Sequence, residues 1–184
     1  MSQDVTENLQ KVLIADDNVH IMNLMRKFFA KAKQKGDLIC DVLEVSDGRQ
    51  AIKVLEEHKP DLILCDINMP NLSGYGVLKY FNNTHVINQP YCFFTFLTSS
   101  ADELQNAFAQ NVKGFLDKNE MNYFVLSNQI GTWLRLAKLE RMQEKKSTDK
   151  KEEPKKEKPM NKIKKETSKE SGETSIGFFS KNQS

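Results

Sequence analysis

Short apolar runs alternate with helical patterns along the first three quarters of the chain. Five apolar segments are predicted as strands, at residues 12–15, 38–45, 62–65, 92–97 and 115–116. Apolar residues recur at helical spacing over about residues 21–36, 48–57, 74–81, 102–110 and 123–140. Apolar strands that alternate with amphipathic helices are typical of a parallel sheet covered on both faces. The pattern predicts an α/β domain at residues 11–144, a five-stranded parallel sheet with helices on both faces, after a flexible N-terminus at 1–10.

The remaining residues, 145–184, have a different composition. Their apolar side chains are Met160, Ile163, Ile176, Phe178 and Phe179. Burial of so few side chains does not offset the entropy of ordering the segment, so we expect a disordered Lys/Glu-rich tail. It carries twelve lysines against seven acidic residues, a net charge of +5, which leaves −3 for residues 1–144 of the formal total of +2. Because acidic residues interrupt the lysines, a solvated tail is favoured over a nucleic-acid-binding arm.

Membrane insertion and export are not expected. No apolar run approaches the roughly 18 residues of a membrane-spanning helix, and the longest candidate, residues 91–97, has the length of a strand. Residues 1–10 are polar and lack the apolar segment of a secretory signal. Cys40, Cys65 and Cys92 each lie in an apolar stretch, so packed, reduced thiols are favoured over disulfides. We therefore expect a cytoplasmic protein.

Polar residues that can carry chemistry follow four of the predicted strands. They are Asp16 and Asp17, then Asp66, then Thr98, Ser99 and Ser100, and finally Asp117 and Lys118. Ligands of open α/β sheets bind outside the carboxyl ends of the strands. Clustered carboxylates without histidine or cysteine suit a hard cation such as Mg²⁺. The alternative is that Asp16 and Asp17 merely cap the helix that follows them.

These strand ends also carry a resemblance to a known family. Four motifs stand in order: Asp16-Asp17, the stretch from Leu62 to Pro70 with Ser73-Gly74, Leu97-Thr98-Ser99, and the stretch from Gly114 to Lys118. Over about residues 11–142 the sequence resembles the receiver domain of two-component response regulators. The resemblance implies the flavodoxin-like, receiver-type fold with strand order 2-1-3-4-5.

The resemblance further implies that Asp66 is the phosphoacceptor, which takes a phosphoryl group from a phosphohistidine or a small phosphodonor. The implied Mg²⁺ ligands are Asp16, Asp17, Asp66 and the backbone carbonyl of Asn68. Such an ion would offset the repulsion between an anionic nucleophile and an anionic donor.

The phosphoryl-binding and switch residues implied by the resemblance are Thr98, Ser99, Phe115 and Lys118. Lys118 would pair with a phosphoryl oxygen, and Thr98 would hydrogen bond to another while Phe115 moves inward behind it. Asn119 stands where the family usually has a proline after a cis bond. A cis bond before a non-proline residue costs about 2.5–4 kcal/mol, so the geometry of this bond is open.

Three classes of function compete. The first is a single-domain response regulator, a phosphoacceptor and not an enzyme, which catalyses its own phosphorylation. Its donor would be a histidine kinase or histidine phosphotransfer protein, and it would signal by phosphorylation-dependent binding to an unidentified downstream protein, with no DNA-binding domain after Met142. The second is a pseudo-receiver that binds partners independently of phosphorylation. The third is a haloacid-dehalogenase-like phosphatase, which needs an aspartate where this chain has Asn68.

Overall fold

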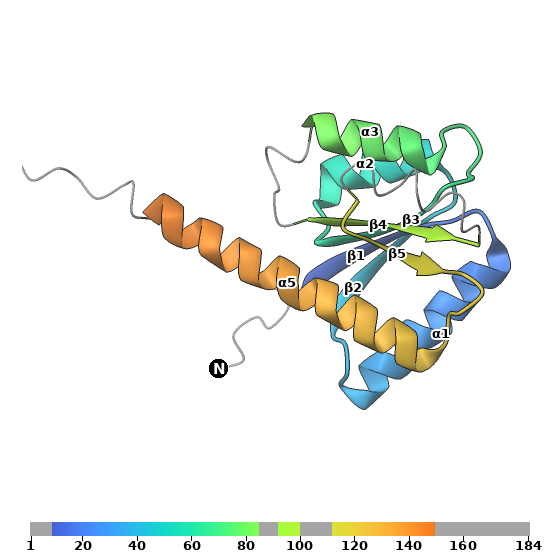
Figure 1. Ribbon diagram of the computed structural model, residues 1–184, viewed down its shortest axis with the longest axis horizontal. Coiled ribbons are helices and arrows are strands. Elements are labelled where there is room, and N and C mark those ends of the chain that lie inside the picture. Colours follow the sequence, from blue (N-terminus) through green and yellow to red (C-terminus); the bar gives the residue numbers. More distant parts are fainter. Residues whose placement is uncertain (1–8, 85–91, 100–111, 150–184) are drawn as a thin grey trace, which may run out of the picture. The chain divides into compact units, whose positions relative to one another are not determined.

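The computed structural model has a five-stranded parallel sheet between two layers of helices (Figure 1). It describes residues 9–84, 92–99 and 112–149. The strands are β1 Gln10–Ala15, β2 Cys40–Val45, β3 Leu62–Asp66, β4 Phe93–Thr98 and β5 Gly114–Asp117. The helices are α1 Val19–Lys35, α2 Gly48–His58, α3 Gly74–Thr84 and α5 Tyr123–Asp149. The order β2-β1-β3-β4-β5 with parallel pairing throughout confirms the predicted flavodoxin-like α/β fold.

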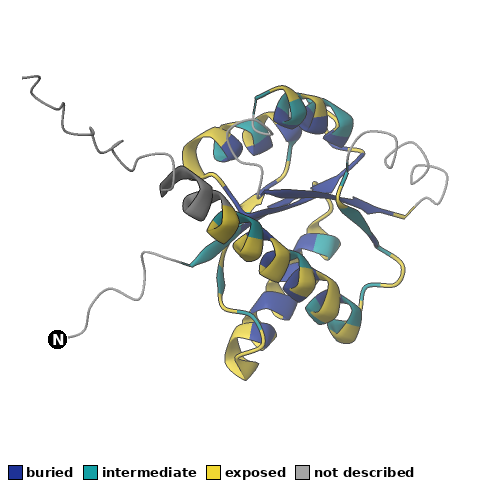
Figure 2. Cartoon of the chain, turned by 60° about the vertical axis from the view of Figure 1, so that its left-hand side comes forward, coloured by how far each residue is buried: buried dark blue, intermediate teal, exposed yellow. Residues whose placement is uncertain are grey.

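Each face of the sheet has its own apolar core, because alternate residues of a strand point to opposite faces. On β1, Val12 and Ile14 pack in the core shared with α1 and α5, whereas Leu13 and Ala15 pack in the core shared with α2 and α3. All four side chains are fully buried. Figure 2 shows the buried positions on the helix sides that face the sheet. Burial on both faces explains why the strands appear in the sequence as continuous apolar runs.

The start of β2 differs from its prediction. Helix α1 ends at Gly36, which has the left-handed φ of 74° that favours glycine. The N–H groups of Asp37 and Leu38 both donate to the Ala32 carbonyl of the last turn of α1, at 2.9 and 3.5 Å. Leu38 therefore belongs to the exit from the helix, and β2 begins at Cys40 and not at residue 38.

The final helix is longer than predicted. It runs to Asp149, so the domain boundary predicted at 144 falls inside α5. Lysine, glutamate and glutamine favour helix, and no proline stands between Tyr123 and Pro154. The predicted helix at 102–110, residues 1–8 of the N-terminus predicted to be flexible and the predicted tail beyond residue 149 lie outside the described residues.

The three cysteines are free thiols, as predicted. Cys65 and Cys92 are buried and Cys40 is half-buried. Burial raises the pKa of Cys40 to about 11, with the neighbouring Asp41 adding to the effect, so this thiol stays protonated at neutral pH. In the described part of the chain no helix has the length and apolar character needed to cross a membrane.

An ion pair closes the edge of the sheet where the strands begin. Asp61 lies directly before β3 and is buried. Its carboxylate accepts the backbone N–H of Lys11 at 2.8 Å and pairs with Arg141 of α5. Its backbone carbonyl accepts the N–H of Phe93 at 2.9 Å. One buried residue thereby joins β1, β4 and α5.

We expect Arg141→Met to lower the free energy of unfolding by about 3 kcal/mol, because the change leaves a buried carboxylate without its counterion. Urea unfolding at neutral pH, followed by Trp133 fluorescence, measures the effect. Arg135→Met is the matched control, since Arg135 is exposed on the same helix, and its effect should stay within about 0.5 kcal/mol. Equal effects of the two changes would show that the ion pair contributes nothing to stability.

Candidate functional site

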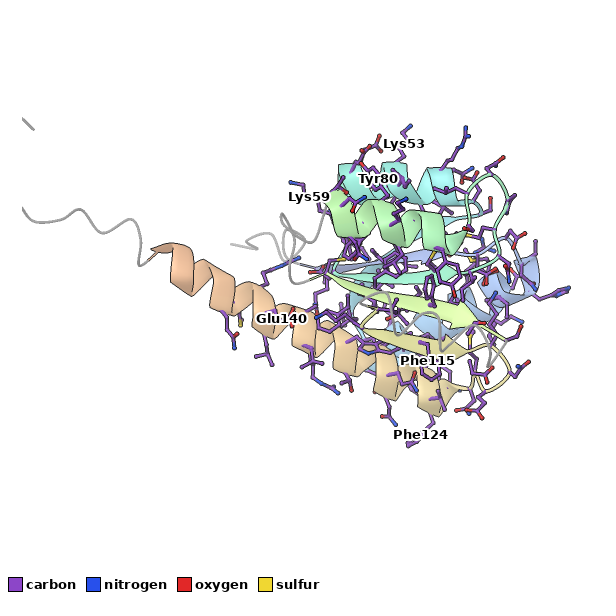
Figure 3. All side chains as sticks on the ribbon, turned by 45° about the horizontal axis from the view of Figure 1, so that its top comes forward. Lys53, Lys59, Tyr80, Phe115, Phe124 and Glu140 are labelled. Atoms are coloured by element: carbon purple, nitrogen blue, oxygen red, sulfur yellow. The ribbon has the colours of Figure 1, made fainter. Side chains whose placement is uncertain are left out.

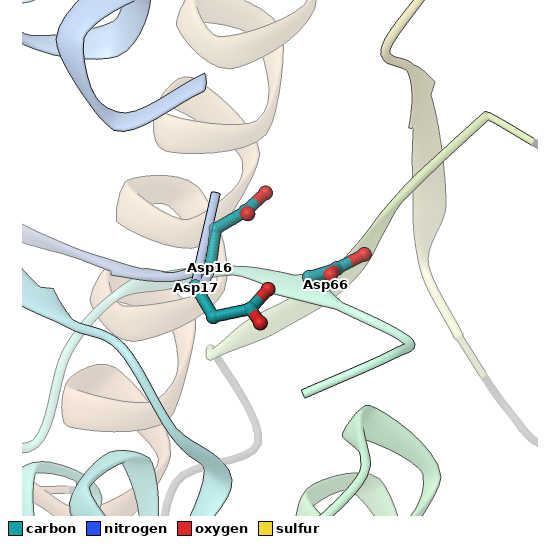
Figure 4. Close-up of side chains that lie close together, drawn as sticks. All are labelled: Asp16, Asp17 and Asp66. Carbon is teal, nitrogen blue, oxygen red and sulfur yellow. The ribbon is translucent and has the colours of Figure 1, made fainter. Parts of the chain in front are cut away.

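The carboxyl ends of β1 and β3 bring three aspartates together (Figure 4). Ala15 of β1 pairs with Cys65 of β3, so the next residues, Asp16 and Asp66, lie side by side at the edge of the sheet. One carboxylate oxygen from each of Asp16, Asp17 and Asp66 lies within 4.8 Å of the other two. Asp16 is 0% exposed and Asp66 6%, whereas Asp17 is exposed. The cluster is therefore buried toward the sheet and open toward solvent.

Lys118 supplies the positive charge of this cluster. Its ammonium nitrogen lies 2.8 Å from Asp16 Oδ2 and 2.8 Å from Asp66 Oδ1. Asp16 Oδ2 is buried, and the Lys118 ammonium is the charged group that lies against it. With three carboxylates and one ammonium, the described side chains of the cluster have an excess of negative charge.

Burial and neighbouring charges change the acidity of both Asp66 and Lys118. Burial raises the pKa of Asp66, and Asp16 raises it further, whereas the bonds from Lys118 and the Ile67 N–H lower it. The pKa of Lys118 is also raised: burial alone would lower it, but the carboxylates of Asp16 and Asp66 outweigh that effect. Lys118 is therefore cationic at neutral pH.

The backbone around Asp66 fixes its carboxylate. Asp66 Oδ1 accepts the N–H of Ile67 at 2.9 Å in addition to its contact with Lys118. The neighbouring Cys65 donates its thiol to the Asp66 carbonyl at 3.3 Å. Burial raises the pKa of Cys65 well above its ordinary value, so this thiol remains neutral and is unsuited to bind a cation.

The ends of β4 and β5 complete the edge. Thr98 pairs with Asp117 across these strands, and the Thr98 carbonyl accepts the N–H of Lys118 at 2.7 Å. The Asn119 side chain donates to the Ser99 carbonyl at 3.3 Å. Thr98 is buried and Ser99 exposed. These hydrogen bonds bring Thr98, Ser99 and Lys118 to the edge that carries the aspartates.

Other predicted residues are not among the three clustered carboxylates. Phe115 is half-buried on β5, three residues before Lys118, and Asn68 is exposed two residues after Asp66. The Asp117 carboxylate accepts the N–H of Asn119 at 2.8 Å and is not part of the aspartate cluster. Ser100 lies outside the described residues. The Lys118–Asn119 peptide bond, which the sequence leaves open, is trans.

Helix capping does not account for Asp16 and Asp17. The cap of α1 is Asn18, whose side chain accepts the N–H groups of His20 and Ile21 at 2.9 and 3.4 Å. Asp16 Oδ1 instead accepts the N–H of Asn18 at 2.8 Å. This hydrogen bond holds the backbone of the cap residue in place. The alternative explanation for the acidic pair is therefore wrong, and the pair is available to the cluster.

The donor set fits a small divalent cation. Octahedral Mg²⁺ at about 2.0–2.1 Å from its ligands holds oxygens about 3–4 Å apart. The carboxylate oxygens here lie within 4.8 Å of one another. All three groups are hard oxygen donors, the ligand type that Mg²⁺ prefers. Asp16, Asp17 and Asp66 are the side chains that could hold the ion.

Sequence reasoning missed a cavity beside the cluster. Its volume is about 280 Å³, and its walls come from Asp16, Asp17, α1, the end of β2 and the start of α2. Arg26 of α1 and Glu44 of β2 form an ion pair of 2.6 Å in its wall. The two residues lie on consecutive elements, 18 positions apart in the sequence.

Comparisons with known proteins agree with this geometry. A family model described as the response regulator receiver domain matches residues 12–125. The chain is 38% identical over 81 residues to the uncharacterized transcriptional regulatory protein YhcZ of Bacillus subtilis, which covers 42% of this chain and 36% of that protein. It is 38% identical over 88 residues to transcription factor SKN7 of Saccharomyces cerevisiae, which covers 45% of this chain and 13% of that protein. The chain thus spans about a third or less of the length of these curated relatives.

Solved receiver domains share the fold. The signal receiver domain of a Vibrio parahaemolyticus protein has a TM-score of 0.62 at 27% identity and covers 73% of this chain and 97% of that one. The receiver domain of a sensor histidine kinase from Pseudomonas aeruginosa has a TM-score of 0.58 at 20% identity, with coverages of 69% and 98%. That structure carries a magnesium ion in its active-site cleft. At 20% identity the similarity to this second structure shows a common fold alone.

We expect Lys118→Met to lower the free energy of unfolding by about 2 kcal/mol at pH 7 in buffer with a chelator, because the carboxylates lose their charged partner. The pKa of Asp66, already raised in the folded protein, should rise further. Ionisation then destabilises the fold above that pKa, and the penalty disappears as pH falls toward about 3.9, the ordinary pKa of an unfolded aspartate.

Urea unfolding at several pH values tests this expectation. The difference between wild type and Lys118→Met should shrink on acidification. Lys53→Met, at an exposed position of α2, is the control and should show little difference at any pH. A penalty for Lys118→Met that stays constant or grows as pH falls would contradict the argument.

Proposed function

The chain belongs to the response regulator receiver family, and from this premise we propose that Asp66 accepts a phosphoryl group from a histidine kinase or a histidine phosphotransfer protein. The observation that carries the proposal is the position of Asp66 at the end of β3, grouped with Asp16 and Asp17 and paired with Lys118. The phosphorylated protein then signals by binding a downstream partner in the cytoplasm.

In the proposed reaction a carboxylate oxygen of Asp66 attacks the phosphorus of the donor. Asp66 Oδ1 is engaged by Ile67 and Lys118, so Oδ2 is the oxygen that forms the new bond. The bond between phosphorus and the donor's histidine nitrogen breaks, and its electron pair stays on that nitrogen. The product is an aspartyl phosphate, and the chain acts as a phosphoacceptor that promotes its own modification.

Asp16, Asp17 and Asp66 hold Mg²⁺ in this proposal, together with the backbone carbonyl of Asn68. Bound magnesium neutralises charge between the nucleophile and the anionic donor, which would otherwise repel each other. Lys118 then moves from the carboxylates to a phosphoryl oxygen, to which it is a compact point charge. Its place between Asp16 and Asp66 leaves it within reach of either role.

Thr98, Ser99 and Phe115 form the proposed phosphoryl-binding and switch group. The Thr98 hydroxyl would bind a phosphoryl oxygen, and the movement of Phe115 would carry the change to the surface beside β5. A receiver biased between two arrangements in this way binds its partner according to the population of each. The transcriptional regulators similar to this chain are longer proteins. Binding to a downstream partner is therefore proposed here and is not inferred from those relatives.

The other two classes of function give different results in one experiment. The protein is incubated with acetyl phosphate, with and without Mg²⁺, and its intact mass and the free phosphate are measured. A stable increase of one phosphoryl group supports the relay, and continuous release of phosphate supports the phosphatase. No change of mass and no release of phosphate support the pseudo-receiver. Family membership favours the first result.

We expect Asp66→Asn to abolish labelling by acetyl phosphate, because the amide keeps the shape of the side chain and removes the anionic nucleophile. Intact mass spectrometry of the full chain measures the label. Asp41→Asn, at an exposed position of β2, is the control and should be labelled like wild type. Undiminished labelling of Asp66→Asn would place the acceptor elsewhere.

Neutralising Asp17 should weaken Mg²⁺ binding by at least about tenfold, since the effect of an outer-shell change already reaches that size. Titration calorimetry on wild type and Asp17→Asn measures the affinity. The melting temperature should stay unchanged or rise, because removal of one of three neighbouring negative charges relieves repulsion. Equal affinities for Mg²⁺ would remove Asp17 from the ligand set.

A further inference from the structure

We propose that Asp47 and Gly48, at the start of α2, are positioning residues for the aspartate cluster. They fix the loop between β3 and α3, residues 67–73, which carries Asn68. Neither residue belongs to the cluster. The link to magnesium rests on the proposed function, whereas the effect on the loop can be measured without it.

The first support is a backbone contact that only glycine permits. A Cβ at Gly48 would overlap the carbonyl oxygen of Leu72 and lie 2.9 Å from its carbonyl carbon and its Cβ. Backbone atoms cannot move aside as a flexible side chain can. Any residue with a Cβ at position 48 must therefore displace the loop at Leu72 or push α2 away from it.

The loop is also held from the side of α3. A Cβ at Gly76, in the first turn of α3, would overlap Leu72 Cδ1 and lie 2.8 Å from Cγ. The Leu72 side chain packs against the core that α2 and α3 share. The Leu72 backbone thus lies against α2 at Gly48, and its side chain lies against α3 at Gly76. At both positions the helix residue is a glycine, which leaves room for Leu72.

A hydrogen bond next to this contact joins the same two segments. Asn71 has a left-handed φ of 62°, and its side chain bonds to the Asp47 carboxylate. That carboxylate also caps α2, because it accepts the N–H groups of Arg49 and Gln50 at 2.7 and 3.0 Å. Asp47 therefore ties the loop to the cap of the helix.

The loop has little freedom to absorb a displacement. The Leu72 N–H donates to the Pro70 carbonyl at 2.7 Å, and the Gly74 N–H donates to the Ile67 carbonyl at 2.9 Å. A Cβ at Gly74 would overlap the carbonyl oxygen of Asp66. The far end of the loop therefore rests directly on the backbone of the proposed phosphoacceptor, and a shift at Leu72 is transmitted to Asn68 and Asp66.

Helix α2 cannot easily retreat from the loop. Ala51 and Leu55 are fully buried in the core on this face of the sheet. Tyr80 of α3 donates a hydrogen bond to Glu56 of α2, on the outer side of this pair of helices (Figure 3). An added methyl group at position 48 is thus expected to move the loop more than the helix.

The test compares Gly48→Ala with two controls in the full chain. Ala51→Gly lies one turn later on α2 and removes a buried methyl group, so it destabilises the helix without adding an atom against the Leu72 carbonyl. Gly131→Ala makes the same chemical change in α5, where the new Cβ would find only ordinary contacts, 3.5 Å from Leu38. Backbone amide NMR of the metal-free proteins reports on residues 67–73, and titration calorimetry reports on Mg²⁺ affinity.

Gly48→Ala should shift the amide signals of residues 67–73 and weaken Mg²⁺ binding by about tenfold, the lower end of the effect of outer-shell changes. Both controls should leave the loop signals and the affinity near those of wild type, although Ala51→Gly lowers the melting temperature. If Gly48→Ala does not fold, Asn71→Gly is the second variant, because glycine keeps the left-handed backbone and removes the bond to Asp47. It should also shift the amide signals of the loop and weaken Mg²⁺ binding.

Unchanged loop signals in Gly48→Ala, or equal changes in Ala51→Gly, would overturn the assignment of positioning residues. A wild-type protein that binds no Mg²⁺ would instead contradict the proposed function. In that case a loop shift confined to Gly48→Ala and Asn71→Gly would still support the positioning of the loop by α2.

Discussion

The structure depends on the concentration of negative charge at the edge where the parallel strands end. Strand pairing places Asp16 beside Asp66, and the oxygens of three carboxylates lie within 4.8 Å of one another. Two of these residues are buried, which weakens their hydration and raises the pKa of Asp66. Lys118 compensates part of the charge, and two apolar cores stabilise the sheet that holds these groups together. The edge is thereby suited to a ligand that brings positive charge.

Asp61 and Asp66 show that neighbours, and not residue type, decide what a buried aspartate does. Both lie at ends of β3 and both are almost inaccessible. Asp61 has a backbone N–H donor and a dedicated arginine, so its charge is matched within the fold. Asp66 shares one lysine with a second carboxylate, so its charge is only partly matched. The first arrangement stabilises the domain, and the second favours reaction with an electrophile or binding of a cation.

Local rules made the fold and most of the cluster predictable. Strands buried on both faces are visible as apolar runs, and the rule for carboxyl ends then groups Asp16, Asp17, Asp66 and Lys118. Contacts that depend on strand register and helix rotation were not predictable. An example is the ion pair between Arg141 and Asp61, which are 80 residues apart in the sequence. The predicted start of β2 at residue 38 was wrong, because the true start depends on how the chain leaves α1 at Gly36. The cap of α1 at Asn18, directly after the acidic pair, could have been found from its residue type.

The residues that support the site are hard to recognise in the sequence because two of them are glycines. A search for chemistry looks for side chains that can bind, ionise or attack, whereas Gly48 and Gly74 act through the atoms they lack. Their contacts hold the β3–α3 loop and the Asp66 backbone against two helices, on the half of the site built from β1 and β3. The proposed switch residues Thr98 and Phe115 lie on β4 and β5, the other half. A site divided in this way can keep its cation ligands in place while the residues that respond to the phosphoryl group change position.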